Sequence, residues 1–442
     1  MSRTLRSLFA VVLSLGILSA VVAWQNAGSK TVSPTEKISA LQSPGATYWK
    51  GNLHTHSLWS DGDDFPEMIA DWYKRNGYQF LTLSDHNILS DGERWIDVTS
   101  GKGTRELALK KYVDRFGFSW VERRKKPTDG KVEQVRLKPL AEFRSVLEEP
   151  SKFLLIPGEE ITHRFALRPV HMNAINLRDV IAPTDGASVA ETISVNLRAV
   201  EEQRKKKGWK TIAFLNHPNF VWGVKAEDML TEELKYFEIF NGHPGVKNYG
   251  DDTHVSTERM WDIVLALRLG KHKLPIVLGM ATDDAHSYHV YGVGKVNPGR
   301  GWIMVKAPYL TAETIVRGIE AGDYYCSTGV VLKDVRCSSK ELALAIRPEP
   351  GVTYRTQFIA TMRDAVLTSE PRKDKEGKPL DVTRNYSDEV GKVVAESDLL
   401  EPSYRLTGKE FYVRAKVIST KLHPNPYQKG DVEVAWTQPA LP

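Results

Sequence analysis

The chain has 442 residues, of which 41% are hydrophobic and 26% are charged. This composition is that of a globular protein and excludes a disordered, collagen-like or coiled-coil chain. The formal net charge is +5, and part of it lies in the basic runs 123–126 and 204–207. We expect the first run to form a solvated turn and the second to form a helix C-terminus. Because no nucleic-acid-binding motif accompanies these runs, we expect no nucleic-acid partner.

Residues 1–27 have the pattern of a secretory signal peptide. Arg3 and Arg6 precede an apolar run from Leu8 to Ala23, and small and polar residues follow it. The run is short for a membrane span, although an uncleaved N-terminal anchor is the alternative. Residues 28–46 are rich in Ser, Thr, Pro and Gly and are interpreted as a linker. We therefore expect a periplasmic or secreted protein that contacts a membrane only through such an anchor.

Strand-like and helix-like stretches alternate from residue 47 to about residue 330. The expected strands are 48–53, 79–84, 153–156, 211–215, 237–240, 275–280 and 301–305, and the expected helices are 66–75, 189–206, 257–269 and 311–321. Such alternation predicts an α/β fold with parallel strands in a sheet or barrel. The charged and aromatic stretch at about 93–144 interrupts the alternation and is interpreted as an insertion in a loop.

Beyond residue 330 the helical pattern stops. The short runs 342–346, 357–361, 411–418 and 432–436 alternate apolar and polar residues and are separated by turn residues. They predict a small antiparallel β-domain of the sandwich type at 331–442. The two cysteines, Cys326 and Cys337, could form a disulfide in an oxidising compartment or remain two buried thiols, and the sequence leaves both possibilities open.

Residues with metal-binding side chains follow five of the expected strands. The segments are His54-Thr55-His56, Asp85-His86, Glu160, Asn216-His217-Pro218 and Asp283-Asp284-Ala285-His286. In a βα barrel the carboxyl ends of the strands converge on one face, so these side chains should point into one pocket, with Asp61 and His171 nearby. His54 and His56 are two residues apart and share one face of an extended chain, so they can bind the same ion.

Six motifs resemble those of the polymerase and histidinol phosphatase (PHP) family and stand in the same order. They are HTHSLWSDG from His54, SDHN from Ser84, PGEEIT from Pro157, VHMNAI from Val170, NHP from Asn216 and TDDAHS from Thr282. The resemblance covers residues 50–330 and implies a distorted (β/α)7 barrel at 47–330 that binds two or three divalent ions. The segments FEIFNGHP from Phe237, GWIMV from Gly301 and YYCSTG from Tyr324 resemble exported members, including a branch related to carbaryl hydrolase, which cleaves a carbamate ester.

The resemblance also implies a set of metal ligands. They are His54, His56, Asp61, His86, Glu160, His171, His217, Asp284 and His286. Glu160 matches the carboxylate that bridges two ions, whereas Glu159 should point away from the site and Asp283 should lie outside the ligand set.

The predicted function is hydrolysis of a phosphate ester by a metal-bound hydroxide. Six neutral imidazoles and three carboxylates leave surplus positive charge on three divalent ions, which would attract an anionic small-molecule ester and lower the pKa of a bridging water. Zn, Mn and Fe suit this ligand set equally. One alternative is a carboxylic ester or carbamate hydrolase with the same site, and a second is a non-catalytic binding protein.

Asn241 and His243 are the candidate catalytic residues outside the ligand set. They follow the expected strand 237–240, so they should face the same pocket, where they could contact the substrate or protonate the leaving group. His243 could equally be an ordinary loop histidine. Ser57 and Ser60 show no arrangement of nucleophile and base and are expected to form loop hydrogen bonds. His254, His289 and Arg300 are weaker candidates.

Overall fold

The structure, a computed structural model, describes residues 46–98 and 104–442. The predicted signal peptide and all but the last residue of the predicted linker lie outside these residues, so their interpretation stays a prediction. Residues 47–442 form one compact unit. Within the described part of the chain, no helix combines the length and the apolar character that a membrane span requires.

The largest sheet of the described residues mixes parallel and antiparallel strands. In spatial order it consists of β19 (Lys392–Ser397), β16 (Tyr354–Met362), β21 (Glu410–Leu422), β22 (Val432–Thr437), β13 (Tyr324–Ser327), β12 (Trp302–Ala307), β1 (Thr47–Asn52), β2 (Phe80–Leu81) and β6 (Leu154–Leu155). β1, β2 and β6 are parallel neighbours. β12 is antiparallel to both β1 and β13. The parallel arrangement expected from the sequence therefore holds for β1, β2 and β6 but not for β12.

A second sheet also combines both kinds of pairing. Its strands, in spatial order, are β11 (Leu278–Thr282), β10 (Tyr236–Asn241), β9 (Ile212–Leu215), β8 (Arg168–Ile175) and β7 (Gly158–Phe165). β9, β10 and β11 are parallel, whereas β7 and β8 form an antiparallel hairpin. Only Ala166 and Leu167 connect β7 to β8, which is too short for a parallel crossover. Glu160 therefore lies inside a hairpin strand and not at the end of a parallel one.

The two sheets are linked by short backbone bridges. Thr55, which follows β1, pairs with Ala285, which follows β11, and His86, which follows β2, pairs with Glu160 on β7. The fold is thus mixed α/β, with its parallel strands divided between two bridged sheets. The closed seven-stranded barrel stays a prediction.

All four expected helices form close to their predicted bounds. They are α3 (Pro66–Arg75), α6 (Val189–Lys207), α7 (Thr257–Ala266) and α8 (Ala312–Ala321), and α7 continues into the π-helical segment η2 (Leu267–His272). Ser188 caps the N-terminus of α6, where its side chain accepts a hydrogen bond from the Glu191 amide, and Gly208, with a φ of 63°, caps the C-terminus. The basic run 204–207 forms its last turn, as predicted. The helices bury apolar side chains such as Ile193, Ile263 and Ile315 in the main core.

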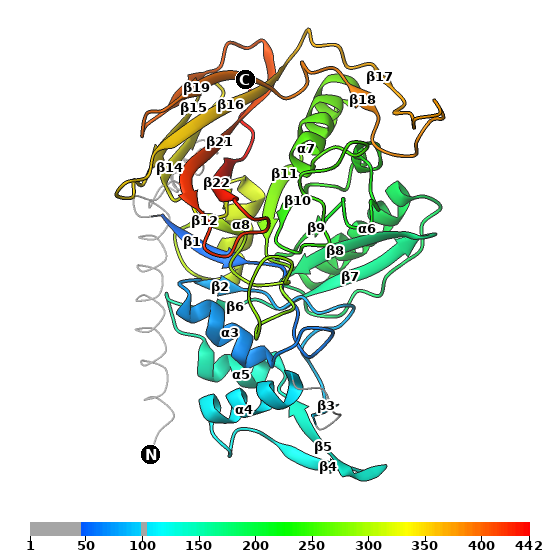
Figure 1. Cartoon of the computed structure of the whole chain (residues 1–442), viewed down its shortest axis with the longest axis vertical. Helices are drawn as coiled ribbons and strands as arrows, with labels where there is room; N and C mark the ends of the chain where they lie inside the picture. The colour runs from blue at the N-terminus through cyan, green and yellow to red at the C-terminus, as the bar shows by residue number, and fades with distance from the viewer. Residues whose placement is uncertain (1–45, 99–103) are drawn as a thin grey trace, which may run out of the picture. The chain divides into compact units, whose positions relative to one another are not determined.

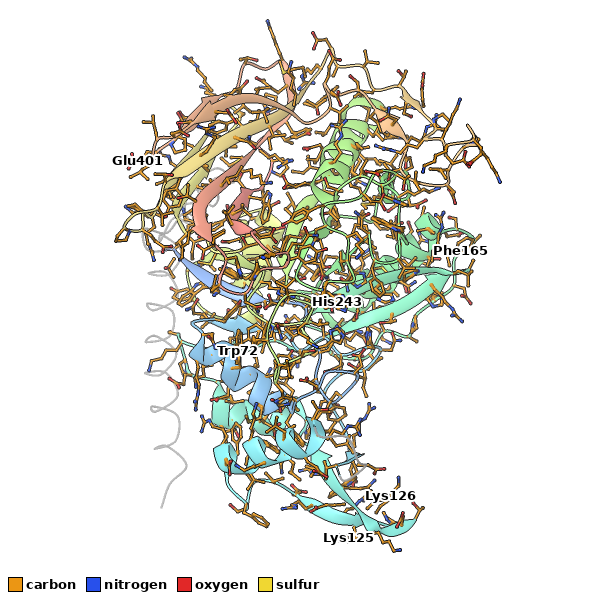
Figure 2. The ribbon with its side chains drawn as sticks, in the orientation of Figure 1. Trp72, Lys125, Lys126, Phe165, His243 and Glu401 are labelled. Atoms are coloured by element: carbon orange, nitrogen blue, oxygen red, sulfur yellow. The ribbon has the colours of Figure 1, made fainter. Side chains whose placement is uncertain are left out.

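The described part of the insertion folds as a subregion between β2 and β6. It contains β3 (Arg94–Asp97), α4 (Thr104–Phe116), β4 (Arg123–Lys126), β5 (Asp129–Leu137) and α5 (Leu140–Leu147), and its three strands are antiparallel in the order β3-β5-β4. Ile96, Tyr112 and Val135 pack with Trp59 in a core of their own. The basic run 123–126 forms strand β4 instead of the expected turn because its backbone pairs with β5. Lys125 and Lys126 lie at the outer end of this hairpin (Figure 2).

The C-terminal segment is β-rich, as predicted. β14 (Leu332–Cys337), β15 (Glu341–Ile346) and β20 (Ser403–Arg405) form a small antiparallel sheet, and β17 (Ser369–Glu370) pairs with β18 (Asn385–Tyr386). The other strands extend the large sheet because β22 pairs with β13, with Thr437 opposite Tyr325. Figure 1 shows this continuation from β1 to the C-terminal strands. Cys326 is buried and Cys337 is exposed, and both are free thiols.

Candidate metal centre

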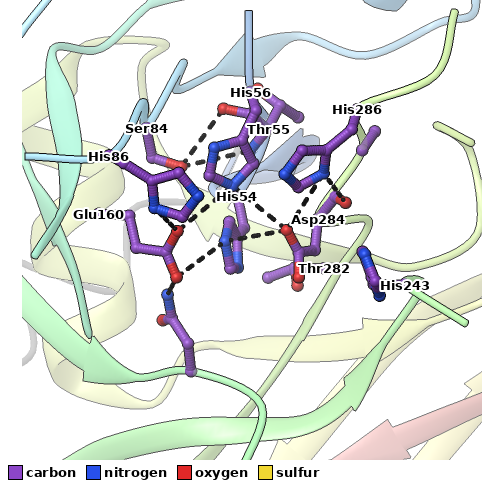
Figure 3. A network of polar contacts seen from close by, with 12 residues as sticks. His54, Thr55, His56, Ser84, His86, Glu160, His243, Thr282, Asp284 and His286 are labelled. Atoms are coloured by element: carbon purple, nitrogen blue, oxygen red, sulfur yellow. Dashed lines mark hydrogen bonds and ion pairs between the residues drawn. The ribbon is translucent and has the colours of Figure 1, made fainter. Parts of the chain in front are cut away.

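A cluster of imidazoles and carboxylates lies where the two sheets are bridged. Figure 3 shows His54, His56, His86, Glu160, Asp284 and His286 pointing toward a common centre. Thr55 pairs with Ala285 through the backbone. The chain neighbours of these two residues, which are His54, His56, Asp284 and His286, therefore share one face. Asp284 has a φ of 49°, a left-handed conformation that is strained for a residue other than glycine. The local backbone therefore directs four of the predicted ligands inward.

One group of potential ligand atoms lies toward the solvent. It consists of His56, Asp61, His86 and His286, whose ligand atoms all lie within 4.8 Å of one another. Oδ1 of Asp61 is 3.4 Å from Nε2 of His286, and Oδ2 of Asp61 is 3.5 Å from Nε2 of His86. The Asp61 side chain is 54% exposed, so this group forms the accessible side of the cluster.

Three further groups lie deeper and share members. They are His54 with His217 and Asp284, His54 with His56 and Glu160, and Glu160 with His171 and His217. Because His54, Glu160 and His217 each belong to two groups, the groups are adjacent. The two oxygens of the Glu160 carboxylate face different imidazoles: Oε1 lies near His171 and His217, and Oε2 lies near His56 and His86. All nine ligands predicted from the sequence are brought together in these four groups of described residues.

The geometry and chemistry of these residues fit a divalent cation. Nε2 of His54 and Nε2 of His56 are buried and have no hydrogen-bond partner among the described residues. Each faces carboxylate oxygens of Glu160 and Asp284 at 3.2 to 3.5 Å. Two atoms that are each about 2.0–2.2 Å from a tetrahedral zinc ion lie roughly 3.3 Å apart. A buried unsatisfied polar atom costs about 1–3 kcal/mol, so a cation between these atoms would remove a substantial penalty.

The charges of the cluster favour a cation as well. Burial favours the neutral forms of Glu160 and Asp284, but His54 and the other neighbouring imidazoles outweigh it and hold the pKa of both carboxyls well below the usual range. Burial likewise opposes protonation of His54, but the carboxylates of Asp284, Glu238 and Glu160 hold its pKa well above the usual value. Both carboxylates are therefore ionised and stabilise positive charge at the centre.

Glu238 on β10 supports the cluster from behind and was not predicted. Its Oε1 lies 2.7 Å from Nδ1 of His54 and accepts a hydrogen bond from the Thr282 hydroxyl at 2.6 Å. Its Oε2 accepts from the His217 amide and from Nδ2 of Asn241, each at 2.8 Å. The sequence feature that could have identified Glu238 is that it is the single charged residue in the apolar strand segment 237–240. The sequence did not indicate that this side chain faces the cluster.

Other polar residues hold the ligands and their loops in place. Nδ2 of Asn216 donates to Oε1 of Glu160 at 2.8 Å. The hydroxyls of Ser57 and Ser60 donate to Asp85 at 2.8 and 2.6 Å, which agrees with the loop hydrogen bonds expected for them. Asp85 belongs to none of the four ligand groups. These contacts order the loop that carries His56 and Asp61.

Asn241 and His243 lie beside the cluster, in different roles. Nδ2 of Asn241 donates to Glu238 and, at 3.1 Å, to Oδ2 of Asp284, while its Oδ1 accepts from the His243 amide at 2.8 Å. The His243 ring lies 5.6 Å from the His286 ring, and its Nδ1 accepts from the Gly245 amide. Burial lowers the pKa of His243 to about 4, so the ring is neutral near pH 7 and carries its hydrogen on Nε2.

Several neighbouring residues point elsewhere. Asp283 accepts hydrogen bonds from the backbone amides of Gly299, Arg300 and Gly301 and from the Tyr73 hydroxyl. Glu159 accepts from the Ile181 amide at 2.6 Å. The three weaker candidates also have other partners. His254 stacks on Trp222, and Nε2 of His289 lies 3.0 Å from the carbonyl oxygen of Asp63. The Arg300 guanidinium donates to the carbonyls of Gly242, Gly292 and Lys295. None of these residues belongs to the four ligand groups of the described chain.

Comparison with known proteins gives similarity to solved structures only. No family model and no curated protein matches the chain. A two-domain protein from Bacteroides vulgatus containing a predicted PHP-like metal-dependent phosphoesterase is 14% identical, with 90% of this chain and 98% of that chain covered and a TM-score of 0.36. A candidate metal-dependent phosphoesterase from Bifidobacterium adolescentis is 15% identical, with 61% and 95% covered and a TM-score of 0.30.

Proposed function

We propose that this chain is a metal-dependent hydrolase of the PHP type that cleaves a phosphate ester. The observation that carries the proposal is the convergence of nine imidazole and carboxylate side chains in four overlapping groups, two of whose buried nitrogens lack a hydrogen-bond partner among the described residues. The two bridged sheets would correspond to the distorted barrel of that family. The order of the sequence motifs supports the same assignment.

The residues of the cluster would hold two or three divalent ions, with Zn, Mn and Fe all suited to the ligand set. When bound, such ions polarise the phosphate group and lower the pKa of a coordinated water. The negative charge of the three carboxylates would be smaller than the positive charge of three divalent ions. The loaded site would therefore be positively charged and would attract an anionic ester. The exposed side near Asp61 would admit this substrate.

Asn241 and His243 would assist in different ways. The neutral His243 ring can donate a hydrogen bond from Nε2 to a substrate oxygen, because its Nδ1 already accepts one from the backbone. The Asn241 amide is engaged with Glu238 and Asp284, so it would position Asp284 and the His243 loop and would not contact the substrate.

Elemental analysis together with two chromogenic esters tests the proposal. We expect purified protein to contain divalent metal and to hydrolyse p-nitrophenyl phosphate faster than p-nitrophenyl acetate. His54→Ala and Asp284→Ala should abolish turnover and lower the metal content while the circular dichroism spectrum is retained.

His254→Ala is the matched control, because His254 stacks on Trp222 outside the ligand groups. Faster hydrolysis of the acetate would favour the carboxylic ester or carbamate hydrolase. Metal binding without turnover of either ester would favour the non-catalytic binding protein. Full metal content and activity in both ligand variants would refute the site.

We also propose that the protein is periplasmic or secreted, on the basis of the pattern of residues 1–27. N-terminal sequencing of protein recovered from the periplasm or medium tests this. A full-length chain found only in the cytoplasm would contradict it.

A further inference from the structure

A cavity of about 420 Å³ opens directly beside the metal centre. Its walls come from the β7–β8 hairpin and from the loop after β9, and they include Arg164, Leu167, Pro169, His171, Phe220 and Val221. His171 belongs both to this wall and to the ligand group with Glu160 and His217. The Phe220 ring lies 5.1 Å from the His217 ring and 5.8 Å from the His243 ring. The cavity therefore lies next to the proposed reaction centre, and His171 belongs to both.

The outer wall presents apolar side chains to solvent. Leu167 is 90% exposed and Val221 is 63% exposed. Val221 and the next residue, Trp222, have φ values of 49° and 55°, a conformation that is rare and strained for a β-branched residue such as valine. The chain thus holds Val221 at the rim at an energetic cost. Apolar side chains grouped around a cavity are typical of a site for the organic part of a ligand.

Arg164 supplies a positive charge at the far end of this wall. Alternate residues of a strand share one face, so Arg164 follows Glu160 and Thr162 along the same side of β7. Four residues of extended chain place it roughly 13 Å from Glu160. The Arg164 side chain is exposed and makes no ion pair or hydrogen bond within the described residues. Its neighbour His163 is paired with Asp185 at 2.9 Å. In Figure 2, Phe165, which follows Arg164 in the chain, lies near the outer end of this hairpin.

We infer that this cavity binds the alcohol part of the ester and selects an aromatic alcohol that carries an anionic group remote from the scissile bond. The aromatic body would lie between Leu167, Val221 and Phe220, and its anionic group would reach Arg164. The inference rests on the proposed function, because it places the ester group at the ligands next to His171. It goes beyond that function by defining the substrate class and Arg164 as a specificity residue.

The test measures binding of the alcohol itself, so that it does not depend on turnover. The full chain is titrated with 6-hydroxy-2-naphthoate and with uncharged 2-naphthol, each followed by its own fluorescence. The wild type should bind the naphthoate more tightly. Arg164→Gln should weaken naphthoate binding about fivefold, since ion pairs at exposed sites are weak. Leu167→Asp should weaken both ligands, and the naphthoate more strongly. Arg336→Gln, at an exposed arginine on β14, is the matched control.

Three results would overturn the inference: no saturable naphthoate binding by the wild type, equal affinities in wild type and Arg164→Gln, or an equal loss in Arg336→Gln. A parallel assay with 6-carboxy-2-naphthyl phosphate tests the proposed function. If the naphthoate binds as expected and no phosphate ester is hydrolysed, the proposed function fails, and the cavity keeps only its assignment as a binding site for an anionic aromatic alcohol. If phosphate esters are hydrolysed but neither the naphthoate nor 2-naphthol binds, the cavity assignment alone fails.

Discussion

Nδ1 of His54 lies 2.7 Å from Oε1 of Glu238, and both side chains are fully buried. With a cation bound at the cluster, this contact would keep the hydrogen of the neutral imidazole on Nδ1 and leave Nε2 to bind the cation. The same carboxylate holds the His217 amide and the Asn241 side chain. Glu238 therefore orients one candidate metal ligand directly and two neighbouring segments through hydrogen bonds.

Replacing Glu238 should weaken metal binding without removing a ligand. Glu238→Gln presents an amide to groups that donate hydrogen bonds, and loss of a carboxylate behind a metal-bound histidine typically lowers affinity about 10- to 100-fold. The measurement is metal content after dialysis against graded chelator concentrations. Glu159→Gln is the control, because Glu159 is equally buried but accepts from the Ile181 amide and lies outside the ligand groups. Equal metal retention in Glu238→Gln and wild type would contradict this role.

Metal removal should lower thermal stability. Without a cation, the ionised Glu160 and Asp284 and the unpartnered nitrogens of His54 and His56 remain buried together, whereas a ligand that binds only the folded state stabilises it. We expect EDTA to lower the Tm by several degrees and added Mn²⁺ or Zn²⁺ to restore it, as measured by scanning fluorimetry. Asp284→Ala should show a smaller response. An EDTA-insensitive Tm in metal-loaded wild type would argue against a metal at this cluster.

Stability should depend on pH through Glu67, in helix α3. Burial raises the pKa of Glu67 to about 7, from a usual value of 4.5. The folded chain then keeps a proton that the unfolded chain releases between these values, so the free energy of unfolding falls as pH rises through this window. The contribution of this group is up to about 3 kcal/mol.

Glu67→Gln cannot ionise, so its stability relative to wild type should be higher at pH 8 than at pH 5. Urea unfolding at the two pH values measures the difference. Glu202→Gln, at an exposed position on α6, should show no such change. A Glu67→Gln effect of the same size at both pH values would disprove the assignment.

A buried ion pair should be essential for attaching the C-terminal strands to the rest of the unit. The Arg414 guanidinium on β21 donates to both oxygens of Asp262 on α7, at 2.8 and 2.7 Å, and the Tyr412 hydroxyl donates to the same carboxylate. Asp262→Ala leaves the buried guanidinium without this partner and should cost about 3–5 kcal/mol in urea unfolding.

The exposed pair of Arg355 and Asp398, 3.0 Å apart, provides the comparison for this prediction. Asp398→Ala should cost less than about 1 kcal/mol, because water screens an exposed ion pair. If Asp262→Ala is no more destabilising than Asp398→Ala, the buried pair does not have the stabilising role assigned to it.

Local patterns in the sequence were sufficient for much of the secondary structure and for the choice of candidate ligands. Pro66 at the start of α3 and Ser188 and Gly208 at the ends of α6 act within a few residues, so the sequence predicts these helices closely. The imidazoles and carboxylates that follow strands could be named for a similar reason, because a side chain just beyond a parallel strand points to the edge where strand ends meet.

Only the tertiary structure decided which of these groups lie together and what supports them. His54 meets Glu238 across 184 residues of chain, β12 runs antiparallel to β1, and β22 joins the large sheet beside β13. Such pairings depend on the burial of whole faces of strands and helices against one another, which a local pattern does not specify. The sequence by itself therefore determined many of the elements and the chemistry of the candidate ligands. Long-range packing determined strand order, the β7–β8 hairpin, the carboxylate behind His54 and the cavity beside His171.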